Sequence, residues 1–329
     1  MPLGPKVISF IVVIALLGGC SIIADRRAET RATEAEATYP PTGQFVQVKG
    51  RQVHAHIEGS GPDLVLIHGA SGNTRDFTFA FVDRMKDDYR VIVFDRPGLG
   101  WTDRVSDEYG GPFNTAAESP AEQAAFLQAA ADQLNVRNPV VLGHSYGGAV
   151  ALAWGLNRPD ETAALVIVAG ASNPWPGSLG LLYGVASSAV GGAAIVPLIS
   201  AFAPENTVET TLESIFAPQA APDGYAEYVG AGLTLRRESF RANARQVNSL
   251  RPHVVEMSQR YNTLPMPVEI VHGTADTSVP IHIHSEPLSQ QIPGAVLTRL
   301  EGIGHMPHHS AAAEVQAAIN RAASRAGLR

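Results

Sequence analysis

The 329-residue chain has little cysteine and little charge, and both shortages narrow what it can be. With a single cysteine, Cys20, no disulfide can form within one chain. Charged residues make up 17% of the sequence, the formal net charge is −7, and there is no long basic run, which argues against a nucleic-acid partner. Hydrophobic residues, at 45%, suffice for one large core. The composition therefore predicts a globular protein.

The first twenty residues, MPLGPKVISFIVVIALLGGC, have the pattern of an export signal. One lysine precedes an apolar run from Val7 to Leu17, shorter than the about 20 residues of a spanning helix, although the uncharged residues 18–23 extend it to a marginal anchor. The end of the run resembles a bacterial lipoprotein signal, which implies that Cys20 is lipidated after cleavage of residues 1–19. We therefore expect an exported protein that is membrane-anchored, either periplasmic or an outer-membrane lipoprotein. Ordinary secretion and an uncleaved signal anchor are the alternatives.

Residues 20–42 are predicted to form a flexible tether. Ala, Arg, Glu and Thr dominate there, Pro40-Pro41 lies near the end, and no apolar stripe is present that could bury a helix. Apolar and polar residues then alternate on both sides of Lys49-Gly50, which predicts an antiparallel hairpin with a tight turn.

Short apolar runs alternate with helical stretches over most of the remaining chain, which is typical of a parallel sheet covered on both faces. The runs are 64–67, 91–94, 140–142, 165–168, 268–271 and 295–300, and the helical stretches lie near 75–86, 120–134, 147–157 and 311–326. Residues 171–264 interrupt this rhythm with helical, strand-free sequence. We therefore predict a core of residues 43–170 and 265–329 with an insertion between two strands.

The stretch VVLGHSYGGAV at residues 140–150 places Ser145 at a sharp turn from a buried strand into a helix. Gly143 and Gly147 suit such a turn because neighbouring backbone approaches closely there. The pattern predicts that Ser145 is a nucleophile held clear of the sheet.

A serine hydroxyl needs a base, and the base needs a partner that fixes its tautomer. In a parallel sheet such groups collect at the carboxyl ends of the strands. His305 and Asp276 follow the two late strands, so we predict them as the base and its partner; capping a helix near Val279 is the alternative role for Asp276. The backbone amides of Ala70 and Tyr146 are the predicted oxyanion hole.

Other polar residues at these strand ends receive structural roles. Asp95 and Arg96 are predicted to hold their own loop by charge-assisted hydrogen bonds. Four further histidines raise the question of a metal, but no metal is predicted because cysteines or carboxylates at ligand spacing are absent from the sequence around them: His282, His284, His308 and His309. No cofactor is expected.

Five motifs in this order resemble the α/β-hydrolase fold superfamily: His-Gly, Asp-Arg-Pro-Gly-x-Gly, Gly-His-Ser-x-Gly-Gly, Gly-x-x-Asp and Gly-His. The resemblance covers roughly residues 43–327. It implies an α/β fold with a mostly parallel eight-stranded sheet, helices on both faces and an α-helical cap over residues 171–264. It also implies a serine hydrolase that acts, through a Ser145–His305–Asp276 triad and an acyl-enzyme, on a small apolar ester or related acyl substrate.

The loop DRPGLGWTDR resembles that of epoxide hydrolases and haloalkane dehalogenases, whose nucleophile is an aspartate. Ser145 occupies that position here, which argues against both activities. Three alternatives stay open: a cofactor-free perhydrolase, a carbon–carbon bond hydrolase, and a non-catalytic ligand-binding protein on the same fold. The sequence indicates no oligomeric state.

Overall fold

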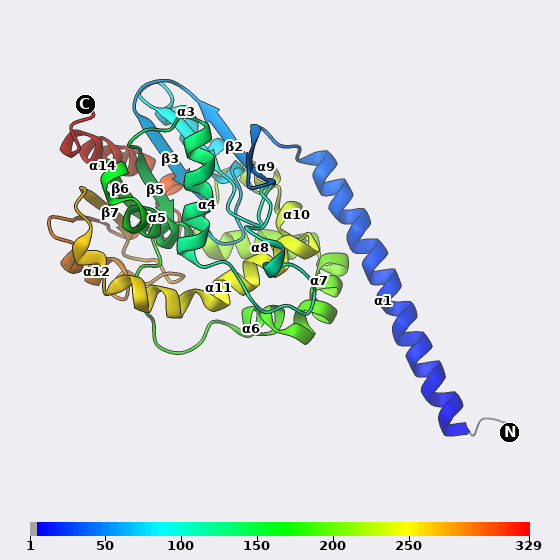
Figure 1. Cartoon of the computed structure of the whole chain (residues 1–329). Helices are drawn as coiled ribbons and strands as arrows, with labels where there is room; N and C mark the ends of the chain where they lie inside the picture. Colours follow the sequence, from blue (N-terminus) through cyan, green and yellow to red (C-terminus); the bar gives the residue numbers. More distant parts are fainter. Residues whose placement is uncertain (1–4) are drawn as a thin grey trace.

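The apolar runs of the sequence form strands of an eight-stranded sheet (Figure 1). A computed structural model describes the backbone of residues 5–329 and the side chains of residues 22–329 except 205 and 206. The strand order is β1-β2-β4-β3-β5-β6-β7-β8, with β1 and β2 antiparallel to their neighbours and every later pair parallel. The strands are β1 (Gln44–Val48), β2 (Arg51–Glu58), β3 (Asp63–Ile67), β4 (Arg90–Phe94), β5 (Val140–His144), β6 (Ala164–Val168), β7 (Val268–Gly273) and β8 (Val296–Leu300). The predicted fold class is confirmed.

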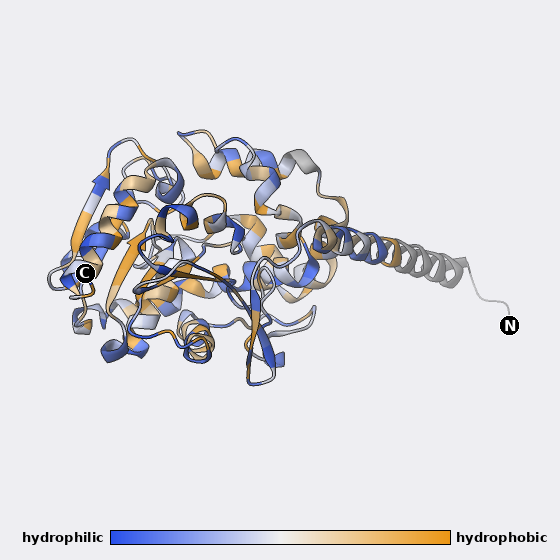
Figure 2. Cartoon of the chain, turned by 90° about the horizontal axis from the view of Figure 1, so that it is seen from above, coloured by the Kyte–Doolittle hydropathy of each residue, from blue (hydrophilic) through white to orange (hydrophobic). Residues whose placement is uncertain are grey.

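Both faces of the sheet are covered, which explains why β3 to β7 are solidly apolar. Along β3, Val65 and Ile67 point to one side and pack with α4 (Pro120–Gln133) and α5 (Tyr146–Asn157). Leu64 and Leu66 point to the other side and pack with α3 (Phe81–Met85) and α14 (Ala312–Arg325). Figure 2 shows hydrophobic strands surrounded by helices that carry both hydrophilic and hydrophobic residues. The alternation of side chains along a strand therefore feeds two separate cores.

Helices α6 to α11 lie between β6 and β7 and form the insertion, hereafter the cap. No strand occurs in it among the residues that the structure describes, as the sequence predicted. Its elements are α6 (Leu181–Ser187), the π-turn η3 (Gly191–Ile195), α7 (Val196–Phe202), α8 (Glu205–Phe216), α9 (Tyr225–Val229), α10 (Ala231–Thr234) and α11 (Arg237–Ser258). Short helices complete the core: α2 (Arg75–Thr78), α12 (Ser285–Gln291), α13 (Pro307–Ser310), and 3₁₀ turns at Asp107–Tyr109, Pro159–Glu161 and Tyr261–Thr263.

The flexible conformation expected for residues 20–42 is wrong, because helix α1 (Pro5–Thr38) runs through most of that segment. Ala24, Ala28 and Ala35 are buried, and the first two pack on Ala201 of α7. These alanines recur on one helical face, and their small size lets α1 lie close to the cap. Alanine is small and only weakly apolar, so a stripe of alanines does not stand out in the sequence as a surface that a helix buries.

The export signal expected over residues 1–19 and the lipidation site expected at Cys20 fall where the structure describes no side chains, and residues 1–4 lie outside it altogether. Both stay predictions.

Candidate active site

The carboxyl ends of the parallel strands bring the predicted residues to one edge of the sheet. Ile67, Phe94, Gly143 and Ile167 are register partners across adjacent strands. The loops that begin after residues 67, 94, 144 and 168 therefore start side by side, and those after β7 and β8 join them.

Ser145 occupies the turn between β5 and α5 with a φ of 54° and a ψ of −119°. A non-glycine residue with this backbone conformation is strained, and surrounding contacts must hold it. The Ser145 amide donates to the Val168 carbonyl at 3.0 Å, and a Cβ at Gly147 would collide with the Ile67 carbonyl oxygen. Close packing of backbone around the turn thus requires glycine and leaves the Ser145 hydroxyl partly exposed.

His305 connects the serine to a carboxylate. Its Nε2 lies 3.0 Å from Ser145 Oγ, and its Nδ1 lies 2.7 Å from Asp276 Oδ2. Since an ionised carboxylate only accepts hydrogen bonds, Nδ1 carries the proton and Nε2 offers a lone pair to the Ser145 hydroxyl. The structure therefore brings together the three residues that sequence reasoning selected, in a chain of hydrogen bonds.

Asp276 is held by more than His305. Its Oδ1 accepts from the backbone amides of Ser278 at 2.8 Å and Val279 at 2.9 Å, so the capping role considered from the sequence and the contact to His305 use different oxygens of one carboxylate. His272 Nε2 lies 3.0 Å from Oδ2. Burial alone raises the pKa of a carboxyl, but the hydrogen bonds from His272 and His305 outweigh it and hold the pKa of Asp276 well below its usual range. Asp276 is thus a fixed anion.

The two amides predicted as an oxyanion hole belong to segments that adjoin Ser145. Tyr146 is the first residue of α5, where backbone N–H groups lack helical acceptors. The loop that carries Ala70 abuts the serine, because a Cβ at Gly69 would stand 3.0 Å from Ser145 Cβ. Within the described part of the chain, neither amide donates to a backbone acceptor.

Arg96 connects the loop that carries Ala70 to the start of α5 and to the cap. Its guanidinium donates to the Gly69 carbonyl at 2.9 Å and to Gln246 of α11 at 2.7 Å, and it lies 3.8 Å from the centre of the Tyr146 ring. Burial lowers the pKa of Arg96 to about 10, so the group stays charged at neutral pH. Asp95 accepts from the amides of Thr74 at 2.6 Å and Trp101 at 2.8 Å. Asp95 holds its own loop through the Trp101 amide, as predicted, whereas the Arg96 side chain holds the neighbouring loop at Gly69 and not its own.

Asn243 of α11 is a site residue that sequence reasoning missed. Its Oδ1 accepts from the Ser71 amide at 2.7 Å, and its Nδ2 donates to Ser71 Oγ at 2.8 Å. Ser71 adjoins Ala70, so the cap directly holds the loop of residues 68–73, called the oxyanion loop here because it carries the predicted donor Ala70. No signal in the sequence could have revealed a contact between residues 172 positions apart.

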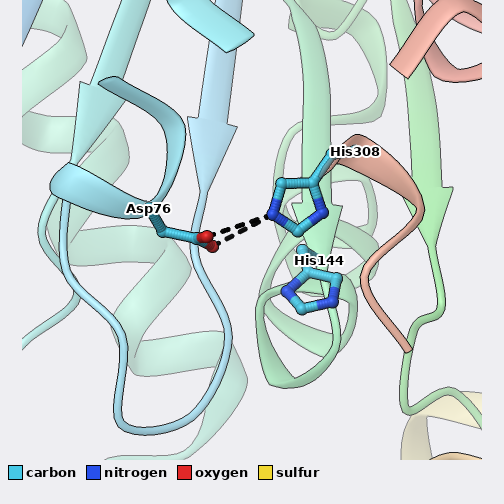
Figure 3. Close-up of side chains that lie close together, drawn as sticks. All are labelled: Asp76, His144 and His308. Atoms are coloured by element: carbon cyan, nitrogen blue, oxygen red, sulfur yellow. Dashed lines mark hydrogen bonds and ion pairs between the residues drawn. The ribbon is translucent and has the colours of Figure 1, made fainter. Parts of the chain in front are cut away.

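Further histidines lie near the triad: the His144 ring is 4.9 Å from the His305 ring, and Figure 3 shows His144 and His308 beside Asp76. His144 Nε2 donates to the His305 carbonyl at 2.9 Å, which supports the loop that carries the base. His308 Nε2 contacts both oxygens of Asp76 at 3.2 Å, and His309 Nε2 contacts one at 2.9 Å. These hydrogen bonds offset burial and hold the pKa of Asp76 well below its usual range. Neither His308 nor His309 takes the place of His305 beside Ser145.

Asp76, His144 and His308 could each offer one ligand atom to a metal, all within 4.8 Å of one another. Asp76 already accepts hydrogen bonds from both neighbouring histidines and from the Tyr225 hydroxyl at 2.8 Å. This hydrogen-bonded arrangement accounts for the cluster without an ion. It shares only His308 with the histidines that the sequence brought into question, and the absence of a metal stays a prediction.

The fold and the strand-end geometry define the chain as a protein of the α/β-hydrolase type. Residues 64–318 match the family described as "Alpha/beta hydrolase family", and the chain belongs to it. It is therefore a hydrolase.

Named relatives agree with this class. A 2-hydroxymuconate semialdehyde hydrolase from Pseudomonas putida is 26% identical over 270 residues, which cover 81% of this chain and 88% of the relative. The solved structure of an esterase from Exiguobacterium antarcticum shares the fold with a TM-score of 0.67 at 19% identity, over 85% of this chain and 99% of the esterase. An α/β-hydrolase fold protein from Burkholderia ambifaria gives a TM-score of 0.69 at 24% identity, over 85% and 98% of the two chains.

Proposed function

We propose that the protein is a serine hydrolase that cleaves a small apolar ester or related acyl substrate through an acyl-enzyme. The observation that carries the proposal is the continuous contact from Ser145 Oγ to His305 Nε2, at 3.0 Å, and from His305 Nδ1 to Asp276, at 2.7 Å. A binding protein would need none of these contacts. A strained backbone at Ser145 supports the same reading, because strain of this kind persists where function requires it.

Each group has one task. Ser145 Oγ attacks the substrate carbonyl carbon while its proton moves to His305 Nε2, and Asp276 stabilises the imidazolium that forms. The carbonyl oxygen becomes an anion, to which the amides of Ala70 and Tyr146 donate hydrogen bonds in this proposal. When the tetrahedral intermediate collapses, His305 returns the proton to the leaving alkoxide. Water then attacks the acyl-enzyme by the same steps in reverse and releases the acid.

The test is labelling with a fluorophosphonate probe. Wild-type protein should react covalently, and Ser145→Ala should not, while its thermal unfolding stays unchanged. Correctly folded wild-type protein that is not labelled would refute an activated serine and favour a ligand-binding protein on the same fold. In the positive case, acyl esters of increasing chain length then define the acyl pocket.

Hydrolysis of a carbon–carbon bond is the second candidate, favoured by the similarity to 2-hydroxymuconate semialdehyde hydrolase across 81% of this chain. The same three residues would serve that reaction. A vinylogous 1,5-diketone offered beside the best ester separates the two, because an esterase turns over the ester alone.

We also propose that the protein is exported and anchored to a membrane through its N-terminus. The support is the sequence of residues 1–20, with an apolar run followed by a single cysteine. Mass spectrometry of the mature N-terminus decides between the forms: a lipidated Cys20 supports a lipoprotein, an intact Met1 supports a signal anchor, and a free N-terminus beyond Cys20 supports secretion.

A further inference from the structure

Helices α6 and α7 of the cap expose an unusual number of large apolar side chains. Residues 162–204 contain no Asp, Glu, Lys or Arg, whereas about a quarter or more of an ordinary soluble surface is charged. Leu181 is 84% exposed, Val190 75% and Phe202 50%. We call the following set the apolar cap face: Leu181, Leu182, Val190, Ile195, Leu198 and Phe202.

The helical spacing explains why these side chains are exposed together. Ile195, Leu198 and Phe202 recur at intervals of three and four residues, so they form one stripe on the outside of α7. Val196, which packs with Ala186 and Ala244 of the cap, and Ala201, which packs on α1, are fully buried. Helix α7 therefore already buries part of its surface against the cap and against α1, and the stripe is a further apolar surface that neither of them covers.

Helix α1 lies directly beside this surface (Figure 1). Arg27 Nε donates to the Ala201 carbonyl at 2.8 Å, and the Arg27 guanidinium lies 5.2 Å from the Phe202 ring. Ile22 and Ile23 of α1 are 55% and 62% exposed and add to the apolar area. The sequence before them, from Val7 onward, has no charged residue, and 17 residues of helix span about 25 Å. A lipid bilayer that holds this uncharged segment would therefore have its surface next to α7.

The charge that α1 brings beside the apolar cap face is mostly positive. Arg26, Arg27 and Arg31 follow Ile23 within about two helical turns. The two acidic residues of the same stretch, Asp25 and Glu29, are already paired with Arg237 at 2.8 and 2.5 Å. Arginines that border an apolar surface suit the boundary between acyl chains and anionic headgroups.

We propose that the apolar cap face docks onto a lipid bilayer beside the N-terminal anchor, with α6 and α7 lying in the interface and the arginines of α1 at the headgroups. Among the described residues no single helix is long and apolar enough to cross a membrane. Helix α6 and the segment Gly191–Phe202 together have the length and composition of a membrane span, but they are bent by 94° relative to each other. At 7 and 12 residues these pieces reach about 10 and 18 Å, which is short of the about 30 Å of a hydrocarbon core. An interfacial position suits such lengths.

Docking would bring the active site to its substrate. Tyr183, the neighbour of the exposed Leu182 on α6, interacts through its hydroxyl with Ser71 and Asn243 beside the oxyanion loop. Helix α6 thus has lipid on one side and the site on the other. The substrate class that follows is an apolar ester dissolved in the membrane, and this part of the inference rests on the proposed esterase function.

The first experiment locates the lipid contact without depending on catalysis. The full chain is inserted into vesicles of phosphatidylcholine and phosphatidylglycerol that contain a lipid with a photoactivatable acyl chain, irradiated, and mapped by mass spectrometry. Adducts within residues 181–202 are expected, and Leu198→Glu should reduce them about tenfold. The matched control Val296→Glu, at a residue 41% exposed on the far edge strand β8, should leave them unchanged.

Two results would overturn the proposal. Adducts confined to the residues before Ile22 would mean that the domain is tethered but does not dock. No cap adducts together with a dimeric mass in light scattering would mean that a second copy of the chain covers the apolar cap face.

The second experiment compares a soluble short-chain ester with a long-chain ester carried in the vesicles. Leu198→Glu should lower kcat/KM about tenfold for the vesicle-borne ester and leave the soluble ester unaffected. Equal losses on both esters would show that Leu198 supports cap structure and would refute docking as its role. If wild-type protein cleaves neither ester, the proposed function fails, and the lipid adducts still decide the docking.

Discussion

Replacing Asp276 by asparagine should lower kcat about 10⁴-fold while the protein stays folded, because the substitution forces His305 into the wrong tautomer. The expectation comes from the donors around this side chain. Oδ1 accepts from the amides of Ser278 and Val279, so the oxygen of the asparagine must stay there. The new NH₂ group then occupies the position of Oδ2 and points a donor at His305 Nδ1.

Two donors cannot face each other, so His305 Nδ1 must become the acceptor and its proton must move to Nε2. An Nε2 that carries a proton cannot take one from Ser145 Oγ. A loss of about 10⁴ corresponds to about 5.4 kcal/mol of transition-state stabilisation. His272 need not change, because its Nε2 also lies 2.8 Å from the Val279 carbonyl and can continue to donate there. The effect should therefore fall on catalysis and little on folding.

The assay is kcat on a soluble p-nitrophenyl ester, with thermal unfolding measured on the same samples. Asp76→Asn is the matched control, since Asp76 is equally buried and bonded to histidines but does not touch His305. It should lose stability and keep kcat within about tenfold. If Asp276→Asn kept kcat within tenfold, or if Asp76→Asn lost as much activity, the tautomer argument would be wrong.

Three further predictions follow from buried contacts. Arg96→Met keeps an unbranched side chain but removes the hydrogen bonds to Gly69 and Gln246; the free energy of unfolding should fall by about 3 kcal/mol, and kcat should fall up to about 10²-fold with KM little changed. Asn243→Ala frees Ser71 and should lower kcat about tenfold in steady-state assays, and an unchanged kcat would argue against control of the oxyanion loop by the cap. Burial lowers the pKa of His284 to about 4, so this histidine takes up a proton at higher pH in the unfolded chain than in the folded protein. The free energy of unfolding should therefore fall by roughly 3 kcal/mol as the pH drops from about 6.5 to 4. His284→Asn keeps an acceptor for the amides of Ser172 and Asn173, and denaturant titrations should show less loss over this range than in wild type.

The strands of the sheet could be predicted because the features that identify each one, an apolar run or a turn residue, lie within a few consecutive residues. A run such as Leu64 to Ile67 is apolar throughout since both of its faces are buried, and the turn at Lys49-Gly50 is readable because both residues have positive φ. Helix α1 could not be predicted in the same way. Its burial depends on alanines that fit only because Ala201, far away in the sequence, presents an equally small surface.

The site likewise contains residues whose meeting follows from the order of the strands and residues whose contacts depend on long-range packing. Ser145, Asp276 and His305 follow directly after strands, so their meeting could be inferred from the order of the strands alone. His272 lies within β7, near its carboxyl end, yet its contact with Asp276 depends on the direction of its side chain, which the order of strands does not give. Asp76 lies on a short helix after a loop, and its pairing with His308 depends on how two distant loops pack.

The cap and the oxyanion loop behave as one mechanical unit, because a single stretch of α11 contacts both. Ala244 packs with Ala186 and Val196 under the apolar cap face, while its neighbour Asn243 holds Ser71. One turn further, Gln246 holds Arg96, which holds the carbonyl of Gly69. Ala70 therefore lies between two residues that α11 fixes. A displacement of α6 and α7 would shift the Ala70 amide. We therefore expect changes in the position of the cap to alter kcat as well as substrate affinity.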